Sequence, residues 1–187
     1  GDPEDFTTFL SAVIDRAAFQ RIVGYIEESR TSVDVDILAG GKHDDRRGFF
    51  IEPTVLVTRD PKSKTMQEEI FGPVLTVYVY ADDEYEQTLS LCDTTSPYGL
   101  TGAVFAKDRD AIALAMDTLR DAAGNFYVND KPTGAVVARQ PFGGARASGT
   151  NDKAGSRLNL MRWVSPRTIK ENFVPPTETA YLYMSEL

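Results

Sequence analysis

One short run of this 187-residue chain, residues 68–73, carries residue types that could hold a ligand. Glu68 and Glu69 supply carboxylates, Phe71 supplies an aromatic ring, and Gly72-Pro73 ends the run. The next seven residues, 74–80, are β-branched or aromatic at six positions, which predicts a strand covered on both faces. A loop held by a rigid sheet can present acidic and aromatic side chains to a polar, planar ligand. The alternative is that both carboxylates are simply solvated.

A second run, Thr133-Gly134-Ala135, lies far downstream and is followed by Phe142. Small side chains leave consecutive backbone N–H groups open to an anion, an arrangement that can hold a carboxylate. The ring of Phe142 could form a wall of the same pocket. The alternative is that Gly134 serves only the geometry of a turn.

Composition excludes several other chemistries. The single cysteine, Cys92, excludes an internal disulfide and a cysteine-based zinc site, and the single histidine, His43, excludes multi-histidine metal sites. We expect His43 to be solvated within a charged tip at 42–47. A balance of 20 basic and 28 acidic residues, a net charge of −8, argues against a nucleic-acid or anionic-membrane surface. No apolar run reaches the roughly 18 to 20 residues that cross a bilayer.

The elements that must position these residues begin with a helix. Asp15 is a plausible N-cap for a helix over 16–30, in which one apolar stripe recurs at helical spacing. Strands are expected over 34–39 and 49–57, with Pro53 at an edge or a bend of the second strand.

From residue 74 the pattern becomes regular. Strands at 74–80, 100–106 and 124–129 alternate with helices at 83–93 and 109–121, which predicts an α/β fold with a parallel βαβαβ unit. Cys92 falls in the apolar stripe of the first of these helices, so we expect it in the core. The long segment 130–155 lacks a clear period and is expected to be functional. A short helix near 156–161 precedes a late strand over 164–173, which we expect to be an arm that pairs elsewhere, for example on another subunit.

Residues 68–74 are similar to the cofactor-contacting motif of the NAD(P)-dependent aldehyde dehydrogenases. Residues 98–105, 124–129 and 141–144 follow at that family's order and spacing. The runs 129–137 and 143–152 narrow the resemblance to members that oxidise L-glutamate gamma-semialdehyde to glutamate in proline catabolism. The likeness extends over nearly the whole chain.

The resemblance implies NAD as cofactor and a role for each site residue. Glu69 would accept hydrogen bonds from the nicotinamide-side ribose hydroxyls, and Phe71 would pack beside that ribose. Gly134 and Ala135 would anchor the α-carboxylate of the substrate through backbone amides, and Phe142 would line its aliphatic part. Close relatives carry Ser at the position of Ala135, so one hydrogen bond worth about 1 kcal/mol is lost here while the backbone donors remain.

The catalytic cysteine segment and the dinucleotide-binding domain of the family do not occur in this chain, and by resemblance both precede Gly1. We therefore expect residues 1–163 to be part of a catalytic domain that contains no catalytic residue, and 164–187 to be a C-terminal oligomerisation strand and tail. The chain alone should be inactive. The resemblance also implies a homo-oligomer in the mitochondrial matrix of a eukaryote, or in the cytoplasm otherwise, with no nucleic-acid or membrane partner. A dehydrogenase of another semialdehyde and a non-catalytic interaction module stay open as alternatives.

Overall fold

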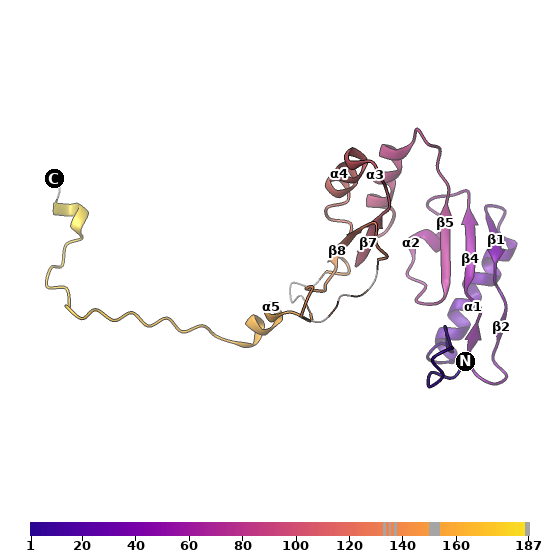
Figure 1. Cartoon of the computed structure of the whole chain (residues 1–187), viewed down its shortest axis with the longest axis horizontal. Coiled ribbons are helices and arrows are strands. Elements are labelled where there is room, and N and C mark those ends of the chain that lie inside the picture. Colours follow the sequence, from indigo (N-terminus) through magenta and orange to yellow (C-terminus); the bar gives the residue numbers. More distant parts are fainter. Residues whose placement is uncertain (133, 135, 137, 150–153, 186–187) are drawn as a thin grey trace.

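The computed structural model describes residues 1–132, 134, 136, 138–149 and 154–185, and shows an α/β chain (Figure 1). Its first part combines a three-stranded sheet with one long helix. β1 runs antiparallel to β4, and β5 runs parallel to β4 on the other side. The elements of this part are α1 (Arg16–Thr31), β1 (Val35–Ala39), β2 (His43–Asp44), β3 (Phe50–Ile51), β4 (Thr54–Thr58), α2 (Lys64–Gln67) and β5 (Val74–Tyr78).

Helix α1 begins where the sequence predicts it. The side chain of Asp15 accepts a hydrogen bond of 2.7 Å from the N–H of Ala18, which satisfies one of the free donors at the helix start. The apolar stripe turns toward the sheet, and its buried members pack with two residues from elsewhere in the chain. This core consists of Phe19, Ile22, Ile26, Ile51 and Ile70. Ile70 belongs to the candidate ligand loop, so that loop is built into the core.

The segment after β1 differs in detail from the expectation. A short antiparallel hairpin, β2 and β3, replaces part of the charged tip, and the strand expected over 49–57 divides at Pro53 into β3 and β4. Proline cannot donate to a ladder, which explains the division. His43 is exposed, as expected, and its ring also lies edge-on against Phe19 with centroids 5.7 Å apart.

The second part of the chain holds a separate two-stranded parallel sheet, β7 and β8. The hydroxyl of Tyr85 on α3 donates to the carbonyl of Ala111 on α4 at 2.9 Å and ties the two helices together. A two-residue antiparallel ladder, β6 with β9, joins this part to a later segment. The elements are α3 (Tyr85–Thr95), β6 (Tyr98–Gly99), β7 (Thr101–Val104), α4 (Arg109–Thr118), β8 (Asn125–Val128) and β9 (Ala145–Arg146).

The α/β prediction is confirmed, but β5 does not join β7 and β8 in one βαβαβ sheet. All five residues of β5 pair with β4, and β7 and β8 pair only with each other among the described strands. The expectation that β5 is covered on both faces is also wrong for this chain, because the side chain of Leu75 is 60% exposed. Cys92, expected in the core, is exposed as well, since burial of the α3 stripe ends at Leu89.

The C-terminal part of the chain extends away from both sheets (Figure 1). Helix α5 (Arg157–Leu160) and the 3₁₀ helix η1 (Met161–Trp163) occupy the predicted short helix, and a second 3₁₀ helix, η2 (Leu182–Ser185), lies near the end. The strand expected over 164–173 does not form in this chain. Those residues are exposed and no described strand pairs with them, and an extended segment becomes a strand only beside a partner edge. No helix among the described residues is long and apolar enough to span a membrane.

Candidate functional site

The loop at 68–73 is fixed at every second residue. Glu68 caps the end of α2, and its carboxylate accepts a 2.5 Å hydrogen bond from the hydroxyl of Tyr25 on α1. Ile70 is 7% exposed and lies in the core. A Cβ built on Gly72 would lie 2.5 Å from Cδ1 of Ile22, so this position packs directly against α1. Alternate residues of the loop are therefore tied to α1 or to the core, although only Ile70 is buried.

The residues between these anchors point outward. Glu69 is exposed, and its carboxylate has no hydrogen-bond or ion-pair partner within the part of the chain that the structure describes. Phe71 is 78% exposed and has a φ of +57°, in the left-handed region. That region costs a residue with a Cβ about 1–2 kcal/mol. Strained backbone held by fixed neighbours is often found where a side chain must be presented to a ligand.

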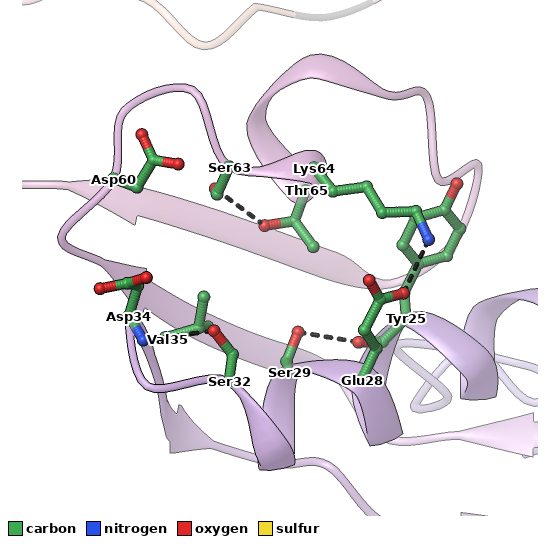
Figure 2. Close-up of a pocket in the computed structure, with 10 residues that line it drawn as sticks. All are labelled: Tyr25, Glu28, Ser29, Ser32, Asp34, Val35, Asp60, Ser63, Lys64 and Thr65. Carbon is green, nitrogen blue, oxygen red and sulfur yellow. Dashed lines mark hydrogen bonds and ion pairs between the residues drawn. The ribbon is translucent and has the colours of Figure 1, made fainter.

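A polar cluster beside the loop links α1 to α2 (Figure 2). The ammonium of Lys64 pairs with the carboxylate of Glu28 at 2.7 Å and lies 5.0 Å from the centre of the Tyr25 ring. The hydrogen bond to Glu68 raises the pKa of Tyr25, and the hydrogen bond to Glu28 raises the pKa of Lys64. The phenol is therefore a stable donor and the ammonium a stable cation at neutral pH.

Tyr25 and Lys64 line two cavities. One, of about 210 Å³, opens between α1 and the turn before α2 and is also lined by Glu28, Asp34 and Asp60 (Figure 2). The other, of about 670 Å³, is lined by Tyr25, Lys64, Gln67, Glu68, Glu69, Pro97 and Tyr98. Both carboxylate residues of the loop, Glu68 and Glu69, line this second cavity.

The downstream half of the candidate site is held more loosely. Gly134 is exposed, and a Cβ built there would meet nothing within 4 Å. Ala135 lies outside the described residues. Phe142 is half-buried, and its N–H donates to the carbonyl of Ala154 at 2.9 Å. The N–H of Gly143 donates to the side chain of Asn125 at 3.3 Å, which ties the segment to β8.

The structure does not bring all the predicted residues into one cavity. The cavity of Glu69 includes neither Gly134 nor Phe142, and Phe71 lines another cavity of about 380 Å³ beside the start of α1. The link between the two halves is indirect: Tyr98 lines the cavity of Glu69 and pairs with Arg146 of β9, four residues after Phe142.

Sequence reasoning missed Tyr25, Lys64 and Tyr98. The available signal for Tyr25 was its place in α1. It lies three residues after Ile22 and one before Ile26, both fully buried. The hydroxyl of Tyr25 therefore lies at the edge of the apolar stripe of α1. Lys64 and Tyr98 had no comparable signal, because only the tertiary fold brings them to Glu69.

Cys92 is a poor nucleophile. Its side chain is exposed, yet the atoms packed around its sulfur desolvate the thiol enough to raise its pKa. The thiolate is the reactive form, so a raised pKa lowers the reactive fraction at neutral pH. The described residues also hold no group of three or more His, Cys, Asp or Glu arranged to bind a metal ion.

Comparisons with known proteins find relatives over nearly the whole chain. The aldehyde dehydrogenase family matches residues 1–169. The mitochondrial delta-1-pyrroline-5-carboxylate dehydrogenase of Dictyostelium discoideum is 60% identical over 98% of this chain and 33% of its own length. The Homo sapiens protein of that name is 57% identical over 98% of this chain and 33% of its own length.

Solved structures give the same result. The crystal structure of delta-pyrroline-5-carboxylate dehydrogenase from Mycobacterium tuberculosis matches with a TM-score of 0.86 and 55% identity, covering 98% of this chain and 34% of that chain. A structure of the same protein bound with NAD matches with a TM-score of 0.80 and 57% identity, and the match covers 92% of this chain and 31% of that chain. The chain thus spans about a third of the length of the relatives that it matches.

Proposed function

Because the chain belongs to the aldehyde dehydrogenase family, we propose that it is the C-terminal portion of an NAD-dependent dehydrogenase that oxidises L-glutamate gamma-semialdehyde to glutamate. The observation that carries this proposal is identity of 60% and 57%, over nearly the whole chain, to relatives named for that activity. Since the chain spans about a third of those relatives, the activity belongs to a longer polypeptide.

The loop at 68–73 provides the cofactor contacts in this proposal. When bound, NAD accepts a hydride from the substrate. Glu69 fits a ribose because its two carboxylate oxygens are exposed and unpaired among the described residues, so they can accept hydrogen bonds from two adjacent hydroxyls. Phe71 provides an exposed ring against which the ribose packs, and its fixed backbone keeps that ring in place.

The downstream segment provides the substrate contacts. The N–H groups of Gly134 and Ala135 hold the α-carboxylate, and Phe142 lines the aliphatic chain that leads to the aldehyde. Open space around Gly134 supports this role, because neither crowding nor a left-handed backbone within this chain requires a glycine there. The absence of a side chain at residue 134 leaves room for a ligand to approach the backbone closely.

The attacking thiolate comes from a part of the polypeptide outside this chain. Cys92 is the only cysteine here, and the raised pKa of its thiol is opposite to what the reaction requires. Residues 164–187 pair with a second subunit in a homo-oligomer, and mitochondrial localisation follows if the source is eukaryotic, as the names of the Dictyostelium and human relatives support. In a bacterial source the enzyme is cytoplasmic.

One experiment tests this function and separates it from its alternatives. The whole polypeptide and this chain alone are each mixed with NAD and glutamate semialdehyde, and NADH formation is followed by absorbance. We expect turnover by the whole polypeptide only. An uncharged aldehyde of the same length should be oxidised far less well, since it lacks the carboxylate that Gly134 and Ala135 bind. Equal rates with both aldehydes would indicate another substrate, and no turnover by the whole polypeptide would favour a non-catalytic interaction module.

A further inference from the structure

We propose that Tyr25 is a positioning residue for cofactor binding: its hydroxyl fixes Glu68, and through the adjacent peptide it fixes the carboxylate of Glu69. The proposal rests on the proposed function, in which Glu69 binds the ribose of NAD. Neither Tyr25 nor Glu68 has a role in that function so far, and Tyr25 was not among the residues predicted from the sequence.

The argument starts from the lack of support for Glu69 itself. Its side chain is exposed and has no polar partner among the described residues, so the position of its carboxylate depends on the backbone on either side. On the C-terminal side, Ile70 is fixed in the core. On the N-terminal side, the hydrogen bond of 2.5 Å from Tyr25 is the one hydrogen bond that the Glu68 side chain makes among the described residues. Without it, Glu68 is an exposed carboxylate at the end of the four-residue helix α2.

The donor is itself presented by a rigid element. Tyr25 lies on α1 between Ile22 and Ile26, both fully buried, and α1 is 16 residues long with a capped start. A hydroxyl carried by such a helix has little freedom to follow a moving loop. The loop must instead follow the hydroxyl, so the hydrogen bond transmits the position of α1 to Glu69.

Lys64 holds the ring of Tyr25 from another side. Its ammonium lies 5.0 Å from the ring centre and is kept there by the 2.7 Å ion pair with Glu28, one turn further along α1 (Figure 2). A cation over an aromatic face is attractive. The same positive charge also interacts with Glu68, so it offsets the repulsion between the carboxylates of Glu28 and Glu68. Tyr25 is therefore held at its ring by Lys64 and holds Glu68 with its hydroxyl.

The test is made in the whole dehydrogenase with Tyr25→Phe, which removes one hydroxyl and keeps the ring. We expect the KM and the dissociation constant for NAD to rise about tenfold, as loss of part of a hydrogen bond to a charged group implies, while the KM for glutamate semialdehyde changes less than about twofold. If Tyr25 were a purely structural residue, its substitution would lower the melting temperature and would change the KM values for NAD and for glutamate semialdehyde to a similar extent.

Tyr85→Phe is the matched control. It removes one phenolic hydroxyl that also donates a single hydrogen bond, at 2.9 Å to Ala111, but in the part of the chain that holds β7 and β8. We expect Tyr85→Phe to lower the melting temperature and leave the KM for NAD unchanged.

Variants of the loop complete the test, and they remain informative if Tyr25→Phe folds poorly. Glu68→Ala should weaken NAD binding as Tyr25→Phe does, and the double variant should be no weaker than either single variant. Glu68→Gln keeps an acceptor for the hydroxyl and should restore most of the affinity. Glu69→Gln tests the ribose contact directly and should weaken NAD binding at least as much as Tyr25→Phe.

The outcomes separate this proposal from the proposed function. If Glu69→Gln weakens NAD binding while Tyr25→Phe and Glu68→Ala do not, the positioning role is wrong and the function stands. If Glu69→Gln leaves NAD binding unchanged, the ribose contact is wrong and the positioning role falls with it. Equal effects of Tyr25→Phe and Tyr85→Phe on the KM for NAD would also overturn the proposal.

Discussion

The two halves of the candidate site are built in opposite ways. The loop at 68–73 is anchored at Glu68, Ile70 and Gly72 by contacts to α1 and the core, all within this chain. The downstream segment is tied by backbone bonds near Phe142, and around Gly134 it leaves open space. The difference teaches that contacts within this chain anchor the loop at 68–73 at several points, whereas the described residues place no atom against Gly134.

The strongest test of this contrast compares two neighbours in the loop. Ile70→Ala removes a buried side chain from the core and should lower the free energy of unfolding by about 2–5 kcal/mol. Phe71→Ala removes an exposed side chain and should change it by less than about 0.5 kcal/mol. Urea unfolding of the whole enzyme, followed by circular dichroism, measures both values. Similar losses for the two variants would show that the loop does not alternate between inward and outward residues.

The same substitution at two glycines compares the two halves directly. Gly72→Ala places a methyl group 2.5 Å from Ile22 and should cost about 1–3 kcal/mol through overpacking. Gly134→Ala meets no atom within 4 Å, so its effect on stability should be neutral or slightly favourable, by about 0.4–1 kcal/mol through the unfolded state. Melting temperatures of both variants decide the point. A destabilising Gly134→Ala would mean that the downstream segment is packed as tightly as the loop.

Two aromatic residues test whether the halves serve different ligands. Phe142→Ala should raise the KM for glutamate semialdehyde by about tenfold, as loss of one or two buried methylene contacts implies, with little change for NAD. Phe71→Ala should do the reverse. Steady-state kinetics with each substrate varied in turn separates the two effects. If both variants raise the same KM, the division into a cofactor half and a substrate half is wrong.

The smallest expected effect is a change in the pKa of Tyr25. Its hydrogen bond to Glu68 favours the protonated phenol, so its pKa in the folded protein lies above its ordinary value near 10. The stabilisation that this bond provides is therefore fully present below the unfolded pKa and is lost as the pH rises through the folded pKa.

The ultraviolet difference between the wild type and Tyr25→Phe, followed against pH, isolates this one tyrosine. In a Glu68→Ala background the same difference should show a lower midpoint, because the acceptor is gone. A midpoint that does not change would mean that Glu68 does not accept a hydrogen bond from Tyr25 in solution. The loop at 68–73 would then be held only at Ile70 and Gly72.

The fold could be predicted from sequence wherever local pattern and tertiary packing agree. The stripe and cap of α1 are local signals, and Asp15, Ile22 and Ile26 behave as predicted. Pairing partners are not local. The pattern of β5 fits a strand in either sheet, and only the completed ladder with β4 decides between them. The strand expected over 164–173 failed for a related reason, since no described partner edge lies beside it.

The site follows the same rule. The outward direction of Glu69 and Phe71 could be anticipated from residue type, since a carboxylate and a ring beside a Gly-Pro pair indicate a loop that faces a ligand. The inward anchors could not be anticipated, because Tyr25 lies 43 residues before Glu68 and only the fold brings the two together. Roles for Glu69, Phe71, Gly134, Ala135 and Phe142 stay predictions until the variants are made.

The close approach of Gly72 to Ile22 also limits how such enzymes can be recombined. The side chain at residue 22 limits the space at residue 72, and the carboxylate of Glu68 accepts a hydrogen bond from Tyr25, so α1 and the loop are matched to each other. A chimera that takes residues 68–73 from a relative, but keeps its own residues 22 and 25, can lose the fit between residues 72 and 22 and the hydrogen bond between residues 68 and 25. Grafts of this loop should therefore cross over before α1 and after β5, so that residues 22, 25 and 68–73 come from the same parent.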